Sequence, residues 1–333
     1  MKKIISAFFF LILFFLFLLF PQEVKSGALD GLFLWYNSVV PILLPFLILS
    51  DIIIKTDSLS FFLLPLFRIK KFIPSFNPAL IYPVFLGLFC GFPMGAKTIA
   101  DLTEKGEITV KEADRFLPVV NQASPMFLAG FVGVHILKKH LSLPEILFYL
   151  YVPPFLFLFG RTIFAFLFSY LPFSTVKSEL KHKRESHLSF AQKSKGLKSG
   201  GFSYDKKNSM SLNMEHTIWN SFHIVVTIGI YMMLFNILSR LCIRLLPTNN
   251  LFVLLLTTLE FSTGLNQLST LSFTNPVIKT GLILSLTSFG GFCTAAQTKS
   301  LIKDTELSIN SYLMQKMLIA AAVFLFYSSS ASS

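Results

Sequence analysis

The residues most able to do chemistry lie where an apolar run breaks. The run ends at Cys90, and a helix is predicted to restart near Ala96. Glycine allows left-handed backbone, while proline removes an N–H donor and favours the first turn of a helix. Inside lipid such a break persists only where it is buried in protein or lines a watery cavity. The break consists of Gly91, Phe92, Pro93, Met94 and Gly95.

Similar breaks follow further along the chain. They are Asn-Gln-Ala-Ser-Pro at 121–125, Glu-Phe-Ser-Thr-Gly at 260–264 and Ser-Phe-Gly-Gly at 288–291. Interrupted apolar segments in corresponding positions of two halves indicate the binding site of a secondary transporter. The predicted substrate-binding residues are Gly91, Phe92, Pro93, Met94, Gly95, Lys97, Asn121, Gln122, Ser124, Ser262, Thr263, Gly264, Gly290, Gly291 and Gln297.

Glu260 is an acid within a run of Leu and Thr. Ionisable groups inside a membrane are functional by default, so Glu260 is predicted to couple a proton or cation to transport. The alternative is that it lies near the outer surface at a hairpin tip and is merely solvated. Asn37 and Ser38 are expected either to face a cavity or to belong to a plain kinked helix.

Composition sets the class of protein. Hydrophobic residues make up 53% of the 333-residue chain and charged residues only 14%, whereas a soluble domain carries about 25% charged residues. The sequence therefore predicts an all-α, polytopic membrane protein. The net charge is +12, but the basic residues lie in predicted loops, where they set topology. No nucleic-acid partner is expected.

An enzyme would need a convergent nucleophile or metal cluster. The six His are scattered, and the three Cys lie in apolar surroundings without metal-ligand spacing. We therefore expect no catalytic residue, no metal and no cofactor.

The predicted organisation has four parts. Residues 1–27 form an N-terminal transmembrane helix, which is favoured over a signal peptide because Pro21-Gln22-Glu23 follows the apolar run without a small-residue cleavage site. Residues 28–171 and 216–333 form two repeats. Between them, 172–215 is basic, rich in Ser and Gly, and without apolar periodicity, which is typical of a disordered cytoplasmic linker. A lipid-headgroup or nucleic-acid role for that linker is the weaker alternative.

The order of features within the two halves predicts an internal repeat. If residues 78–106 form a re-entrant hairpin and the N-terminus is cytoplasmic, most of the 29 Lys and Arg residues lie inside, as the positive-inside rule requires. Each half then crosses the membrane an odd number of times. The halves are thus predicted to be inverted repeats with re-entrant hairpins and broken helices.

These motifs carry a family resemblance. The segment 91–97, the Glu104-Lys105-Gly106 turn and the 121–125 segment resemble the sporulation integral membrane proteins of spore-forming Firmicutes, which have two nucleoside-recognition gate domains. The span 32–50 and the segment 290–304 fit as well. The segment 260–264 departs from the pattern because it lacks the proline of its first-half counterpart. The resemblance implies a layout similar to that of concentrative nucleoside transporters.

The resemblance also implies a substrate, dipicolinic acid, moved across the outer forespore membrane. For this planar dianion, we expect the helix starting near Ala96 to point its N-terminus at a carboxylate. Lys97 would add charge, or else extend to the cytoplasmic interface. Asn121, Gln122 and Ser124 would supply neutral hydrogen bonds, whereas Arg161 is expected to pair or to reach the interface.

Alternative functions are a nucleoside-type small-molecule transporter, or a gate-domain scaffold or sensor that does not transport. The expected partners are a small anionic substrate and the lipid bilayer, and a homo-oligomer is compatible with the sequence. The expected location is the cell membrane or the outer forespore membrane, with the N-terminus and the linker cytoplasmic.

Overall fold

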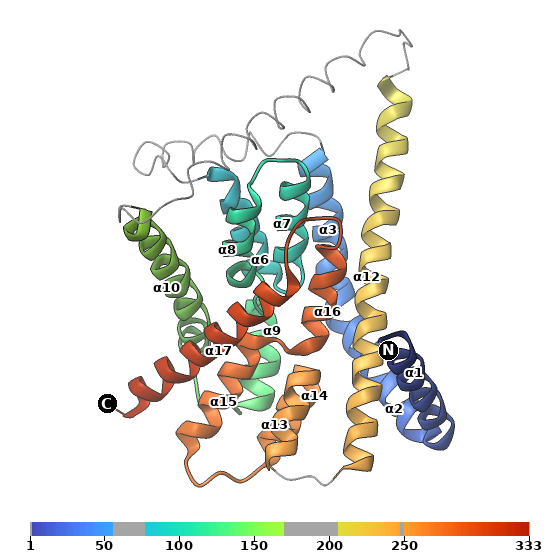
Figure 1. The fold of residues 1–333 in the computed structure, drawn as a ribbon, viewed down its shortest axis with the longest axis vertical. Helices are drawn as coiled ribbons and strands as arrows, with labels where there is room; N and C mark the ends of the chain where they lie inside the picture. Colours follow the sequence, from blue (N-terminus) through green and yellow to red (C-terminus); the bar gives the residue numbers. More distant parts are fainter. Residues whose placement is uncertain (1, 56–76, 170–205, 247–249, 333) are drawn as a thin grey trace.

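A computed structural model describes residues 2–55, 77–169, 206–246 and 250–332, and within those ranges the chain is helical, without strands (Figure 1). The helices are α1 (Lys2–Leu19), α2 (Pro21–Leu34), η1 (Trp35–Val39), α3 (Val40–Lys55), η3 (Pro78–Leu80), α6 (Ile81–Cys90), α7 (Met94–Glu104), α8 (Val110–Val120), α9 (Pro125–Phe127), η4 (Leu128–Ile136), α10 (Leu143–Ser169), α12 (Lys206–Leu245), α13 (Asn250–Leu259), α14 (Phe261–Thr270), α15 (Pro276–Phe289), α16 (Gly291–Leu301) and α17 (Ile309–Ser332).

Several helices have the length and composition of membrane spans. Among the residues that the structure describes, five helices are long and apolar enough to cross a membrane, or six if α1 and α2, bent by 102° at Phe20, count as one span. Large apolar side chains are exposed on these helices, as is expected of surfaces that face lipid tails rather than water. The chain is therefore a multi-pass membrane protein.

Two boundaries differ from those predicted. The second helix begins at Pro21 rather than at residue 28, because proline fits the first turn of a helix. Helix α12 begins at Lys206, so 206–215 are helical and not part of a disordered linker. The rest of the predicted linker, 172–205, lies outside the residues that the structure describes.

Helix α12 packs along α2, η1 and α3. The close approach of α2 to α12 depends on Gly27 and Gly31, because a Cβ on either residue would lie 2.6–2.7 Å from backbone atoms of α12. The indole Nε1 of Trp35 donates to the carbonyl of Val225 at 2.7 Å, which fixes the π-helical turn η1 against α12. At the exposed end of the pair, Arg240 binds Asp30 at 2.6 Å.

In two places, two consecutive short helices are separated by a break of one to three residues and pack against each other. The first pair is α6 and α7, and the second is α13 and α14. A Cβ on Gly264 would lie 2.1 Å from the Cα of Thr257, so the second pair is closely packed. Figure 1 shows α6 and α7 in the upper part of the molecule and α13 and α14 in the lower part.

Two of the candidate spans are broken near their centres. The span Val110–Ile136 loses its regular helix at 121–124, between α8 and α9. The span Pro276–Leu301 is broken at Gly290, whose φ of +80° ends α15 and begins α16. Left-handed backbone of this kind favours glycine, so the Gly-Gly pair explains the second break.

Candidate functional site

A cavity of about 480 Å³ lies where the breaks meet. It is lined by both short-helix pairs, by both broken spans, and by the α2–η1–α3 and α12 helices. Most of the lining is apolar, which is usual for small-molecule sites that carry a few oriented polar groups. Its polar lining residues are Asn37, Ser124, Glu260, Ser262, Thr294 and Gln297.

The first break brings Phe92 into the cavity wall. Gly91 has a φ of +77°, and a Cβ there would lie 2.5 Å from the backbone nitrogen of Ser124. Glycine therefore lets the α6–α7 tip lie directly on the break between α8 and α9. Helix α7 starts at Met94, two residues earlier than expected, and no side chain caps its N-terminus.

Glu260 caps helix α14 from inside the protein. Its carboxylate accepts hydrogen bonds from the backbone N–H groups of Ser262 at 3.1 Å and Thr263 at 2.8 Å. Only 2% of Glu260 is exposed, so it is not the solvated surface acid of the alternative interpretation. The cap also explains how the second pair of helices turns without the proline present in the first.

Aromatic rings join the two tips. Phe92 and Phe261 have ring centroids 6.1 Å apart, and Phe127 and Phe261 have centroids 5.3 Å apart. All three residues line the cavity, as does Phe131. The cavity thus has an aromatic wall made by α9 and η4 and by the tips of both helix pairs.

Behind the wall, the 121–124 break is held by α16 and α17. The side-chain Nδ2 of Asn121 donates to Thr298 Oγ1 at 2.9 Å and to Tyr312 Oη at 2.8 Å. The ammonium of Lys316 donates to the carbonyl of Asn121 and to Gln122 Oε1, both at 3.1 Å. Unwound backbone is thereby satisfied by side chains from distant helices, as low-dielectric surroundings require.

Some of the predicted site residues line the cavity, and others do not. Phe92, Ser124, Glu260, Ser262 and Gln297 line the cavity, and a Cβ on Gly290 would lie 2.8 Å from the Phe92 ring. A second group is buried next to the cavity without lining it: Gly91, Met94, Gly95, Asn121, Gln122, Gly264 and Gly291. Pro93 is buried, and Thr263 binds Asn236 Oδ1 at 2.5 Å.

Lys97 stands apart from these groups. It does not line the cavity, and its ammonium pairs with Asp101 one turn along α7. Asn37 does line the cavity, as one of the two alternatives expected, although its Nδ2 donates to its own helix at Phe33. The side chain of Ser38 lies outside the described part of the chain.

Sequence reasoning missed Lys316, Tyr312 and Thr298. The signal for Lys316 was present, because a lone Lys inside an apolar span of 23 residues is unusual. Tyr312 and Thr298 gave no such signal, since both residue types are common in apolar helices.

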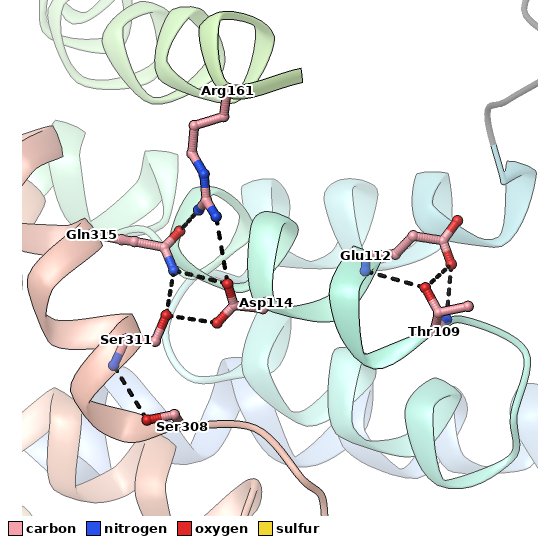
Figure 2. Close-up of polar contacts among 7 residues, drawn as sticks. All are labelled: Thr109, Glu112, Asp114, Arg161, Ser308, Ser311 and Gln315. Carbon is pink, nitrogen blue, oxygen red and sulfur yellow. Dashed lines mark hydrogen bonds and ion pairs between the residues drawn. The ribbon is translucent and has the colours of Figure 1, made fainter. Parts of the chain in front are cut away.

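Arg161 on α10 forms part of a separate polar cluster with residues of α8 and α17. Figure 2 shows its guanidinium between Gln315 and Asp114, with the ion pair to Asp114 at 3.5 Å. Ser311 donates to the same carboxylate at 2.7 Å. Arg161 therefore pairs within the protein, which was one of its two expected roles.

Fold and site together define a class: a multi-pass membrane protein, helical throughout its described ranges, with a cavity lined at the breaks between its helices. Over 91% of its length the chain is similar to the sporulation integral membrane protein YlbJ of Bacillus subtilis (strain 168). The identity is 24% over 339 aligned residues, which cover 77% of that protein. No family model matches the chain, and no solved structure matches it. The similarity supports a membrane protein of sporulation.

Proposed function

We propose that the chain is a transporter-like protein of sporulation whose cavity receives dipicolinic acid during its passage across the outer forespore membrane. The observation that carries this proposal is the cavity itself, which is lined by helix breaks from both halves of the sequence. Irregular backbone at membrane depth is a feature of transporter binding sites.

In this proposal the first and second halves of the chain are inverted repeats. In the first half, a long helix is followed by the α6–α7 pair, the broken α8–α9–η4 span and α10. In the second half, α12 is followed by the α13–α14 pair, the broken α15–α16 span and α17. On this interpretation each short-helix pair is a re-entrant hairpin whose tip reaches the middle of the membrane.

Two helix N-termini beside the cavity supply positive partial charge for an anion, while the acid Glu260 forms another part of the lining. Helices α7 and α16 both begin beside the cavity, and no side chain caps either N-terminus. The positive end of a helix dipole favours a carboxylate without a lysine in the wall. This arrangement replaces the role expected for Lys97, whose charge is already paired with Asp101.

The ring of dipicolinate gives a second basis for recognition. Phe92, Phe127 and Phe261 present aromatic surface to the same cavity as the helix ends. Stacked or edge-to-face aromatic contacts contribute about 0.5–1.5 kcal/mol beyond area burial. A flat aromatic dicarboxylate can therefore use the wall and the helix ends together.

Uptake of labelled dipicolinate into liposomes that contain the purified protein tests the proposal. Gly130 lines the cavity and Gly160 does not, and a Cβ on either meets nothing within 4 Å. Gly130→Trp should fill the cavity and abolish uptake, whereas Gly160→Trp should leave uptake unchanged. Equal uptake by the two variants would contradict transport through this cavity.

Two other functions are outcomes of the same assay. Uptake of labelled uridine but not of dipicolinate would favour a nucleoside-type transporter. Dipicolinate binding to the purified protein without uptake would favour a scaffold or sensor.

A further inference from the structure

Lys316 places an amino group in the protein interior. The residue is 0% exposed, lies on α17 and contacts the break between α8 and α9. Its ammonium donates to two oxygens, the Asn121 carbonyl and Gln122 Oε1, both at 3.1 Å. It also lies 5.2 Å from the centroid of the Phe92 ring.

The groups around this ammonium are neutral. Within the described ranges, Lys316 takes part in no ion pair, so its charge is met by carbonyl dipoles, an aromatic face and the C-terminal end of α8. Each of these stabilises a cation. Unwound backbone carbonyls and half-helix C-termini are also the groups that hold coupling cations such as Na⁺ in transporters with broken helices.

We propose that Lys316 is a tethered internal cation. Its ammonium occupies the position at the α8–α9 break where a transporter with broken helices would bind a monovalent metal ion. The same ammonium contacts the ring of Phe92 and so links the α6–α7 tip to that break. The stability of the assembled fold is therefore independent of Na⁺.

This inference concerns the stability of the fold, and it holds whether or not the cavity carries a solute. Removing the ammonium should leave an oxygen-lined vacancy that a free cation can occupy. A ligand that binds only the folded state raises the unfolding midpoint as its concentration rises. The vacancy therefore predicts chemical rescue of a variant that lacks Lys316.

The test compares thermal unfolding in detergent of wild type and Lys316→Ala, purified throughout in ammonium chloride. Exchange into choline chloride of equal ionic strength should lower the midpoint of the variant, and ammonium or Na⁺ should restore about 3 °C or more. Tetramethylammonium, which is too large for the vacancy, should restore nothing. The wild-type midpoint should be the same in all four salts.

Lys279→Ala is the matched control. Lys279 also donates to two carbonyls, those of Ser269 at 2.6 Å and Leu271 at 2.7 Å, but it is only partly buried. Water can replace its ammonium, so no cation-specific rescue is expected. Lys316→Met keeps a side chain of similar volume in the same place but has no charge. This variant should be less stable than wild type in every salt, and added cations should not rescue it.

Three results would overturn the inference. One is an unfolding midpoint of the wild-type protein that rises specifically with Na⁺. This measurement does not depend on whether a variant folds. Another is a Lys316→Ala midpoint that responds equally to tetramethylammonium and ammonium. The third is a Lys316→Met variant as stable as wild type, which would show that the charge holds nothing together.

Discussion

The ring of Phe92 lies edge-to-face against the ring of Phe261, with centroids 6.1 Å apart and an angle of 64° between the planes. One residue comes from the α6–α7 tip, and the other is the first residue of α14. This contact joins two breaks that the sequence predicted to share one binding site, and both rings line the cavity.

The Phe92–Phe261 contact should be measurable as a coupling energy. Phe92→Ala and Phe261→Ala should each destabilise the protein, and the double variant should lose less than the sum. The expected coupling is about 0.5–1.5 kcal/mol in the free energy of unfolding. Strict additivity would show that the rings do not support each other.

Close packing of the α13–α14 pair predicts strong sensitivity at one glycine. Gly264→Ala would place a Cβ 2.1 Å from the Cα of Thr257, so it should destabilise the protein by about 1–3 kcal/mol. Gly160→Ala is the control, because its Cβ meets nothing and alanine favours a helix. The midpoint of unfolding should fall for the first variant and stay or rise for the second.

Glu260 is predicted to be needed for solute movement and its pH dependence. Glu260→Gln keeps an oxygen that can cap α14 but removes the charge, so dipicolinate uptake should fall and become less dependent on pH. Glu145→Gln is the control, since Glu145 also accepts backbone and hydroxyl hydrogen bonds, from Ser142, but at an exposed helix start. Unchanged uptake and pH profile in Glu260→Gln would end the coupling hypothesis.

Lys97 should matter to stability more than to the cavity. Lys97→Ala leaves Asp101 largely buried without its cation, so the free energy of unfolding should fall by about 1–3 kcal/mol. Adding Asp101→Ala should recover much of that loss, because the remaining buried charge is removed. Dipicolinate uptake should be unchanged once expression is matched, and a specific loss of uptake would return Lys97 to the site.

The helices and their breaks could be predicted because both have local causes. Long apolar runs make spans, and the residues at 91–95 and 290–291 interrupt them through glycine and proline chemistry. The pairing of Lys97 with Asp101 was also available from the sequence, since residues four apart share a helix face.

The contacts behind the cavity could not be predicted in the same way. Lys316 and Asn121 are 195 residues apart, and only tertiary packing brings α17 beside the α8–α9 break. The role of Glu260 as a buried cap likewise depends on how deep the α13–α14 tip lies. Sequence patterns specify which residues interrupt helices, but not which distant groups then satisfy the freed backbone.

Gly290 has a mechanical consequence. The missing side chain leaves a notch in the second half of the protein, and the ring of Phe92 from the first half lies in it. The Phe92 ring thereby interlocks with the second half at this point, in addition to the hydrogen bonds that join Asn121 to Thr298 and Lys316. Any movement of α16 away from the α6–α7 tip would have to withdraw that ring from the notch, so a side chain at position 290 would push the two elements apart.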